Sequence, residues 1–544
     1  MGETAHDHHQ PPPPQAAAAA APPPPPSLAL SRGPTWTPAE QLQQLQYCIH
    51  SNPSWPETCL LAFQHYIVML GTTVLIARYL VPQMGGGPGD TAHVIQTMLF
   101  MTGINTLLQT IIGTRLPTVM GPSYAFVLPV LSIIRDYNNE SFSNEHDRFV
   151  DTMRTIQGSL IVSSFISIIL GYSKGMGPIT VVPVVSLVGL GLFMRGFPLL
   201  ANCVEIGLPD ADSANNLSVY EESSSQGPTL YLRGLACSSA LVSFGLFAAI
   251  LTVSGAYNNV KQQTKQSCRT DRSYFISSAA WVKIPYPFQW GAPIFRASHV
   301  FGMIGAALVS SAESTGTFFA AARLAGATHP PAHVLSRSIG LQGVSLLLDG
   351  IFGAAVGTTA SVENVGLLGL THIGSRRVVQ VSTAFMFFFS IFGKFGALFA
   401  SIPLPIFAAI YCVLFGIVAA VGISFIQFSN NNSMRNHYVL GLALFLGISI
   451  PQYFISNTTG DGHGPVRTDG GWFNDILNTL FSSPPTVAMI VGTLLDNTLE
   501  SRQTINDRGI PWWKPFQNRK GDVRTDEFYS MPLKINEWMP TRFL

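Results

Sequence analysis

The chain of 544 residues is 47% hydrophobic and only 11% charged, with a formal net charge of +1. Average soluble domains carry about 25% charged residues, so this composition, with its many apolar runs of span length, indicates a membrane protein with several spans. The near-zero net charge excludes the basic surface typical of nucleic-acid-binding proteins. The six cysteines are scattered without a CxxC motif or a metal-type spacing, so no metal site is expected.

Both ends of the chain are expected to be tails. Residues 1–56 include HDHHQPPPPQAAAAAAPPPPPS, and runs of proline favour extended, solvated chain, so a disordered N-terminal tail is predicted. Weak metal binding by its histidine cluster is the less favoured interpretation. Residues 501–544 are charged and aromatic, which is consistent with a solvated C-terminal tail near the lipid headgroups.

About 14 candidate spans lie between the tails, seven in each half, so the predicted fold is an all-α polytopic membrane protein. They cover residues 58–81, 92–113, 116–134, 153–172, 179–193, 198–209, 235–256, 299–324, 339–356, 362–370, 377–402, 405–426, 438–455 and 486–499.

Two of these spans differ from ordinary membrane helices. The third, 116–134, is interrupted by Pro117, Gly121, Pro122 and Pro129. The tenth, 362–370, is far shorter than the roughly 20 residues that a span needs. Each is expected to be a short half-helix preceded by an extended strand. Broken spans at corresponding positions of two halves are typical of inverted repeats with a solute site between them.

Acidic side chains in the second half are the strongest candidates for this site. Glu313 lies in the middle of HVFGMIGAALVSSAESTGTFFAAARL, where an acid costs about 2.5–3.5 kcal/mol on insertion scales. Its helical neighbours Ser310, Gly316 and Thr317 are small or polar, so Glu313 is expected to face the bundle interior. A second acid, Glu363, falls at similar depth, which favours a functional role over an acid that only links two helices. Buried acids that exchange a proton at working pH would provide proton coupling.

Glu363 and Asn364 lie at the N-terminus of the short helix. The backbone N–H groups there have no helical partner and can donate to a carbonyl oxygen, while the carboxylate accepts from an N–H group. A planar solute with alternating N–H and C=O groups suits this arrangement. A small inorganic anion does not, because two carboxylates would repel it.

Several other polar residues have two open interpretations. Tyr124, in SYAF, could stack on a flat ring or only pack. Gln64 and His65 lie in the middle of the first span, where a functional role and a structural hydrogen bond are equally favoured. Thr72 lies on the same helical face. Asp349 could bond the broken backbone nearby or mark the end of a span.

Together these residues resemble the nucleobase–ascorbate transporters, also called nucleobase–cation symporters. The family signature is an acid, amide or proline followed by NxGxxxxT, and here it is ENVGLLGLTH, from Glu363 to His372. The resemblance also covers Gln64-His65, SAESTG around Glu313 and GKFGALFASIPLPIF, and extends over nearly the whole chain after residue 50. The tail DRG…WW…KGDVRTDEFYSMP is similar to that of plant members.

The resemblance implies a transporter domain at residues 57–500 with a seven-plus-seven inverted repeat, often dimeric. Spans one to four and eight to eleven would form a core domain; spans five to seven and twelve to fourteen would form a gate domain. It implies uptake of nucleobases such as xanthine, uracil, adenine or guanine together with protons, without another cofactor, across the plasma membrane. No nucleophile–base pair or phosphate-binding glycine loop suggests an enzyme.

The resemblance also assigns roles within the site. Glu313 and Glu363 would bind the base and Tyr124 would stack on it, while Thr72, Ser361 and Val362 would line the pocket. His65 and Asn364 would support it. The predicted set is completed by these further supporting residues: Gln64, Thr317, Asp349 and Thr371.

Some alternatives remain open. Ascorbate-transporting animal members carry proline at the first signature position, so Glu363 favours a nucleobase over ascorbate. His372 replaces the usual basic residue or glycine, and Thr317 stands where some bacterial members have a histidine. Residues 209–232 turn polar where similar plant chains continue an apolar sixth span, so a non-transporting paralogue with an impaired gate domain is a further alternative.

Overall fold

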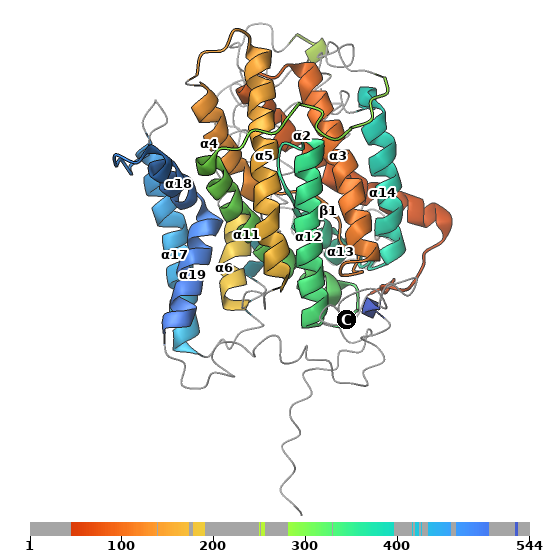
Figure 1. The fold of residues 1–544 in the computed structure, drawn as a ribbon. Coiled ribbons are helices and arrows are strands. Elements are labelled where there is room, and N and C mark those ends of the chain that lie inside the picture. The colour runs from red at the N-terminus through yellow and green to blue at the C-terminus, as the bar shows by residue number, and fades with distance from the viewer. Residues whose placement is uncertain are drawn as a thin grey trace, which may run out of the picture.

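A computed structural model describes residues 45–138, 140–172, 178–190, 281–328, 330–395, 433–458, 464–499 and 528–530, with short pieces between 250 and 255 and between 416 and 426. Several predicted segments lie outside these residues. They are most of both predicted tails, 1–56 and 501–544, the span 198–209, the polar segment 209–232, and most of the spans 235–256 and 405–426. Within the described part, the protein is a bundle of helices around one two-stranded ladder (Figure 1).

The helices follow the predicted apolar runs closely. They are α2 (Trp55–Met84), α3 (Pro88–Ile111), α4 (Val127–Asn138), α5 (Glu145–Tyr172), α6 (Pro178–Leu190), α11 (Ala297–Leu324), α12 (Ala332–Phe352), α13 (Val362–Thr371), α14 (Arg376–Ile391), α17 (Met434–Ser456), α18 (Gly471–Phe481) and α19 (Pro484–Thr498). Four helices of the described part, α2, α3, most of α5, and α17, are long and apolar enough to cross a membrane.

Several helix boundaries differ from the prediction, and one helix was not predicted. α5 begins at Glu145 rather than at residue 153, and α12 begins at Ala332 rather than at residue 339. α12 ends at Phe352 rather than at residue 356 because Gly353 adopts the left-handed conformation (φ 72°) that caps a helix. The 11-residue helix α18 was not predicted, since it is too short for a span and mixes polar with aromatic side chains.

The two broken segments meet in an antiparallel pair. β1 (Met120–Pro122) precedes the one-turn helix η1 (Tyr124–Phe126) and α4, while β2 (Thr358–Ala360) precedes α13. Met120 pairs with Ala360, and Pro122 with Thr358. The ladder satisfies backbone groups that would otherwise be unpaired inside the bundle, which is the condition for non-helical chain at membrane depth.

Glycines allow the closest approaches in this bundle. A Cβ atom on Gly121 of β1 would lie 2.3 Å from the Met69 side chain of α2. Between α5 and α12, a Cβ on Gly171 would lie 2.5 Å from the Cα of Gly340. Small residues of this kind let membrane helices pack tightly.

The helices form two neighbouring groups. α2, α3, α5, α12 and α14 pack around the ladder, with α12 against α5 and α14 against both α2 and α3. α6, α17 and α19 pack on one another, and α11 contacts members of both groups. Figure 1 shows α17, α18 and α19 on one flank of the bundle, with α3 and α14 toward the other.

Parts of both predicted tails pack on the helix bundle. Tyr47 forms a β-bridge with Ile373, so the packed chain begins before residue 57. Near the other end of the chain, Phe528 and Tyr529 are buried, and Arg337 of α12 donates to the Tyr529 carbonyl oxygen at 3.1 Å. These two segments therefore pack on the helix bundle rather than standing apart from it.

Candidate functional site

Glu313 lies in the middle of α11 and is buried, with 5% of its surface exposed. Ser123, directly after β1, donates from its hydroxyl to Glu313 Oε2 at 3.4 Å. The Thr317 hydroxyl donates to the Glu313 carbonyl oxygen at 2.8 Å. The acid is therefore held where α11 passes the end of β1, while Thr317 bonds its backbone rather than its carboxyl group.

Glu363 lies in the first turn of α13, and Ser361 is the N-cap of that helix. The Ser361 hydroxyl accepts from the Asn364 backbone N–H at 3.2 Å and donates to Glu363 Oε2 at 2.7 Å. Serine is among the preferred N-cap residues because its oxygen satisfies one of the unpaired N–H groups. The same hydroxyl thus starts the helix and orients the acid.

A buried histidine connects α2 to this turn. His65 Nδ1 lies 3.0 Å from Asn364 Oδ1, and the Asn364 amide nitrogen donates to Ser361 Oγ at 3.0 Å. With its nitrogen directed at Ser361, the amide presents its oxygen to the histidine, so Nδ1 carries the hydrogen. His65, Asn364, Ser361 and Glu363 consequently form one continuous chain of hydrogen bonds.

The two acids lie close enough to interact electrostatically. Among the described residues, neither one forms a salt bridge with lysine, arginine or histidine. Buried charges are ordinarily paired, so two carboxyl groups without a cation form an acceptor-rich site that favours N–H donors or protons over anions.

The structure places the remaining predicted residues at different positions. Tyr124, in η1, is buried next to Ser123, and Val362 is buried in the first turn of α13. Gln64 and Thr72 are buried on α2, and within the described part the Thr72 hydroxyl makes no hydrogen bond.

Two of the predicted supporting residues are not in contact with the acids. Thr371 lies at the far end of α13 and donates to the Leu367 carbonyl oxygen at 2.8 Å. Asp349, near the end of α12, accepts instead from Asn105 Nδ2 at 3.0 Å.

The sequence analysis missed the hydroxyl groups that connect α11 to the ladder. Ser314 Oγ lies 3.0 Å from Thr359 Oγ1 and accepts from the Ala360 backbone N–H at 2.9 Å. Ser314 directly follows Glu313, as Ser123 directly precedes Tyr124. Their position next to a candidate acid or aromatic residue is the sequence feature that could have identified these serines.

Comparisons with known proteins show the family of this chain. A model of a permease family, Xan_ur_permease, matches residues 56–456. Nucleobase-ascorbate transporter 3 of Arabidopsis thaliana is 69% identical over the whole of both chains. Nucleobase-ascorbate transporter 2 of the same plant is 54% identical, covering 92% of this chain and 97% of the relative.

Among solved structures, the transmembrane domain of a cyanobacterial bicarbonate transporter, BicA, matches with a TM-score of 0.42 and 15% identity, covering 74% of this chain and 97% of that one. The family model and the full-length relative establish the family to which the chain belongs. The chain belongs to the nucleobase–ascorbate transporter family, and it is an integral membrane transporter of a small-molecule solute rather than an enzyme.

Proposed function

We propose that this protein takes up nucleobases, such as xanthine, uracil, adenine or guanine, together with protons. The observation that carries this proposal is the pair of buried acids, Glu313 on α11 and Glu363 at the start of α13, which interact without a neighbouring cation among the described residues. Carboxylates accept from N–H groups, and purine and pyrimidine bases carry such groups on their edges.

The rest of the site supports a flat, polar ring. The first N–H groups of α13 are directed out of the helix end and can donate to a carbonyl oxygen of the solute. Tyr124 is near enough in the chain to Ser123, and hence to Glu313, to offer its ring as a stacking surface. The Ser361 and His65 bonds hold Glu363 and Asn364 in place before the solute arrives, which lowers the cost of binding.

The same two acids, Glu313 and Glu363, also provide a way to couple transport to protons. Two ionised carboxyl groups in a dry interior repel each other, and a proton on one of them removes that repulsion. Binding of the base and binding of a proton then stabilise the same arrangement, which is the thermodynamic requirement for coupling.

Movement of the two helix groups past each other would expose the site alternately. The helices around the ladder are proposed as the core domain, and α6, α17, α18 and α19 as part of the gate domain. A complete set of 14 spans in an inverted repeat, assembly as a homodimer, and residence in the plasma membrane stay predictions from the family resemblance.

Ascorbate is the alternative solute, and the names of the relatives include it. Ascorbate is a monoanion at neutral pH, so it would meet two carboxyl groups instead of a cation. The site therefore favours a neutral base, and direct competition decides between the two.

The test is uptake of tritiated xanthine, uracil, adenine and guanine by yeast cells that lack their own base transporters, in acidic and in neutral medium. We expect uptake of at least one base, faster in acidic medium, that unlabelled ascorbate does not compete with. The Glu363→Ala variant should reach the membrane and lose this uptake. Ascorbate uptake without base uptake would replace the proposal, and absence of both would identify a non-transporting paralogue.

A further inference from the structure

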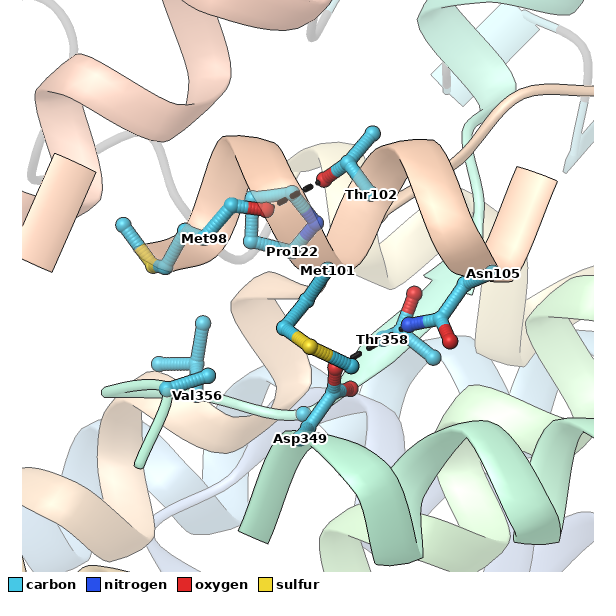
Figure 2. A pocket seen from close by; sticks show the side chains of 10 residues that line it. Met98, Met101, Thr102, Asn105, Pro122, Asp349, Val356 and Thr358 are labelled. Carbon is cyan, nitrogen blue, oxygen red and sulfur yellow. Dashed lines mark hydrogen bonds between the residues drawn. The ribbon is translucent and has the colours of Figure 1, made fainter. Parts of the chain in front are cut away.

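A third buried acid, Asp349, lies in a small cavity behind the ladder, apart from the Glu313–Glu363 pair. Figure 2 shows this cavity between α3 and the end of α12. Its lining includes Asn105 of α3, Asp349 of α12, Pro122 of β1 and Thr358 of β2. The space for the centre of a water-sized molecule is about 10 Å³, close to the minimum that one ordered water needs.

Hydrogen-bond donors are scarce in this cavity. Asn105 Nδ2 donates to Asp349 Oδ1 at 3.0 Å, the contact drawn as a dashed line in Figure 2. Asp349 Oδ2 and Asn105 Oδ1 are buried acceptors without a hydrogen bond in the described part of the chain. Asp349 is 2% exposed and Asn105 is fully buried. The backbone N–H of Thr358 is a second, neutral donor to the Asp349 carboxyl group. An ionised carboxylate held only by neutral donors is poorly compensated for its lost hydration, whereas one added proton removes the charge and supplies a donor.

The elements packed around Asp349 present neutral groups. α3 contributes Met98, Met101 and Thr102, whose hydroxyl donates to its own helix. α5 packs on α12 through Gln157, which donates to the Gly350 carbonyl oxygen at 3.3 Å.

The loop before α11 contributes the indole N–H of Trp290, which donates to the Gly353 carbonyl oxygen at 2.9 Å. Two titratable groups lie beyond Trp290: His93 of α3, whose ring is 4.6 Å from that of Trp290, and Lys283, whose Nζ donates to His93 Nδ1 at 2.9 Å. Arg337 of α12 lies 12 positions from Asp349, about 18 Å along the helix.

The cavity and the solute site share the ladder. Successive residues of a strand point to opposite sides. Thr358 lines the Asp349 cavity, while the next residue, Thr359, bonds Ser314 and the Ser310 carbonyl oxygen on α11, beside Glu313. Pro122 likewise lines the cavity, and the following Ser123 bonds Glu313. The two acidic sites therefore lie on opposite sides of one two-stranded ladder.

We propose that Asp349, positioned by Asn105, is a second proton-binding site of this transporter, linked to the solute site through the β1–β2 ladder. On binding, Asp349 Oδ2 takes one proton from water, and the charge of the carboxyl group falls from −1 to zero; release returns the proton to water. The linkage to solute binding rests on the proposed function, but proton binding by Asp349 does not.

The first test measures thermal unfolding of the purified protein in detergent over a range of pH. Asp349 is ionised in the unfolded chain at neutral pH, so folding of the wild type takes up one proton at this residue. Stability should then fall as pH rises, by up to tenfold in the folding constant per pH unit. Asp349→Asn should lack this component of the slope, whereas Asp147→Asn, at an exposed acid of α5, should keep it. An unchanged slope in Asp349→Asn would overturn the proposal.

A second variant covers the case in which Asp349→Asn does not fold. Asn105→Leu removes the side-chain donor to Asp349 and leaves the backbone N–H of Thr358. A neutral carboxyl group loses one ordinary hydrogen bond, whereas an ionised one loses one of the two donors that stabilise its charge, so the destabilisation should be small in acidic buffer and grow as pH rises. Equal destabilisation at every pH would refute proton binding.

The linkage is tested by counting the protons taken up when xanthine or uracil binds. Fewer protons in Asp349→Asn than in the wild type supports the linkage, and the same number refutes it. The unfolding experiment uses no solute, so its result stands whether or not bases are transported.

Discussion

Replacing Ser361 by alanine tests how the start of α13 prepares the site. The Ser361 hydroxyl caps the helix by accepting from the Asn364 N–H and donates to Glu363 Oε2 at 2.7 Å. Loss of an N-cap costs about 1 kcal/mol of stability, and loss of a bond to a charged group about 1.5–3 kcal/mol. If about half of the latter loss falls on solute binding, the dissociation constant of the base rises about three- to tenfold.

The assay is equilibrium binding of tritiated xanthine and uracil to purified protein, with thermal unfolding measured on the same samples. Ser361→Thr keeps a hydroxyl and should restore most of the affinity. Thr371→Ala removes one hydroxyl bond at the other end of α13, to the Leu367 carbonyl oxygen, and is the matched control. It should lower stability by up to about 1 kcal/mol and leave affinity unchanged. Wild-type affinity in Ser361→Ala, or equal losses in both alanine variants, would refute the reasoning.

Three further predictions concern one hydrogen bond of the site and two contacts within the bundle. The changes His65→Ala and Asn364→Ala should be non-additive in base affinity, with a coupling of about 1 kcal/mol in a double-mutant cycle, because the two side chains share one bond; additive losses would contradict this. Gly171→Ala should lower unfolding stability by about 1–3 kcal/mol in a thermal-shift assay, since its Cβ would overlap the backbone of Gly340; a stable variant would contradict it. Tyr529→Phe should lower stability by about 1 kcal/mol in that assay, because the buried hydroxyl bonds the bundle; no change would contradict it.

The sequence was most informative where membrane physics makes residues costly. Glu313 and Glu363 were found because an acid in a long apolar run requires a reason. The broken segments were found because prolines and a short apolar run cannot form full spans. Asn364 followed from its position beside Glu363, and Ser361 from the family resemblance.

Contacts between distant parts of the chain could not be derived in the same way. Pairing of Pro122 with Thr358 joins residues more than 200 positions apart, and their local composition carries no register. Asn105 is one polar residue among several in α3, and only the fold shows that it meets Asp349. The burial of Tyr529 was missed because a short aromatic segment in a charged tail has no periodic pattern.

The central claim is that Glu313 and Glu363 bind a base together with a proton. It is tested most directly in proteoliposomes that contain the purified protein and a pH-sensitive dye inside. Adding external xanthine or uracil should acidify the interior, and Glu313→Gln, correctly folded and inserted, should abolish the signal. Base entry without acidification, or acidification by Glu313→Gln at the wild-type rate, would contradict the account.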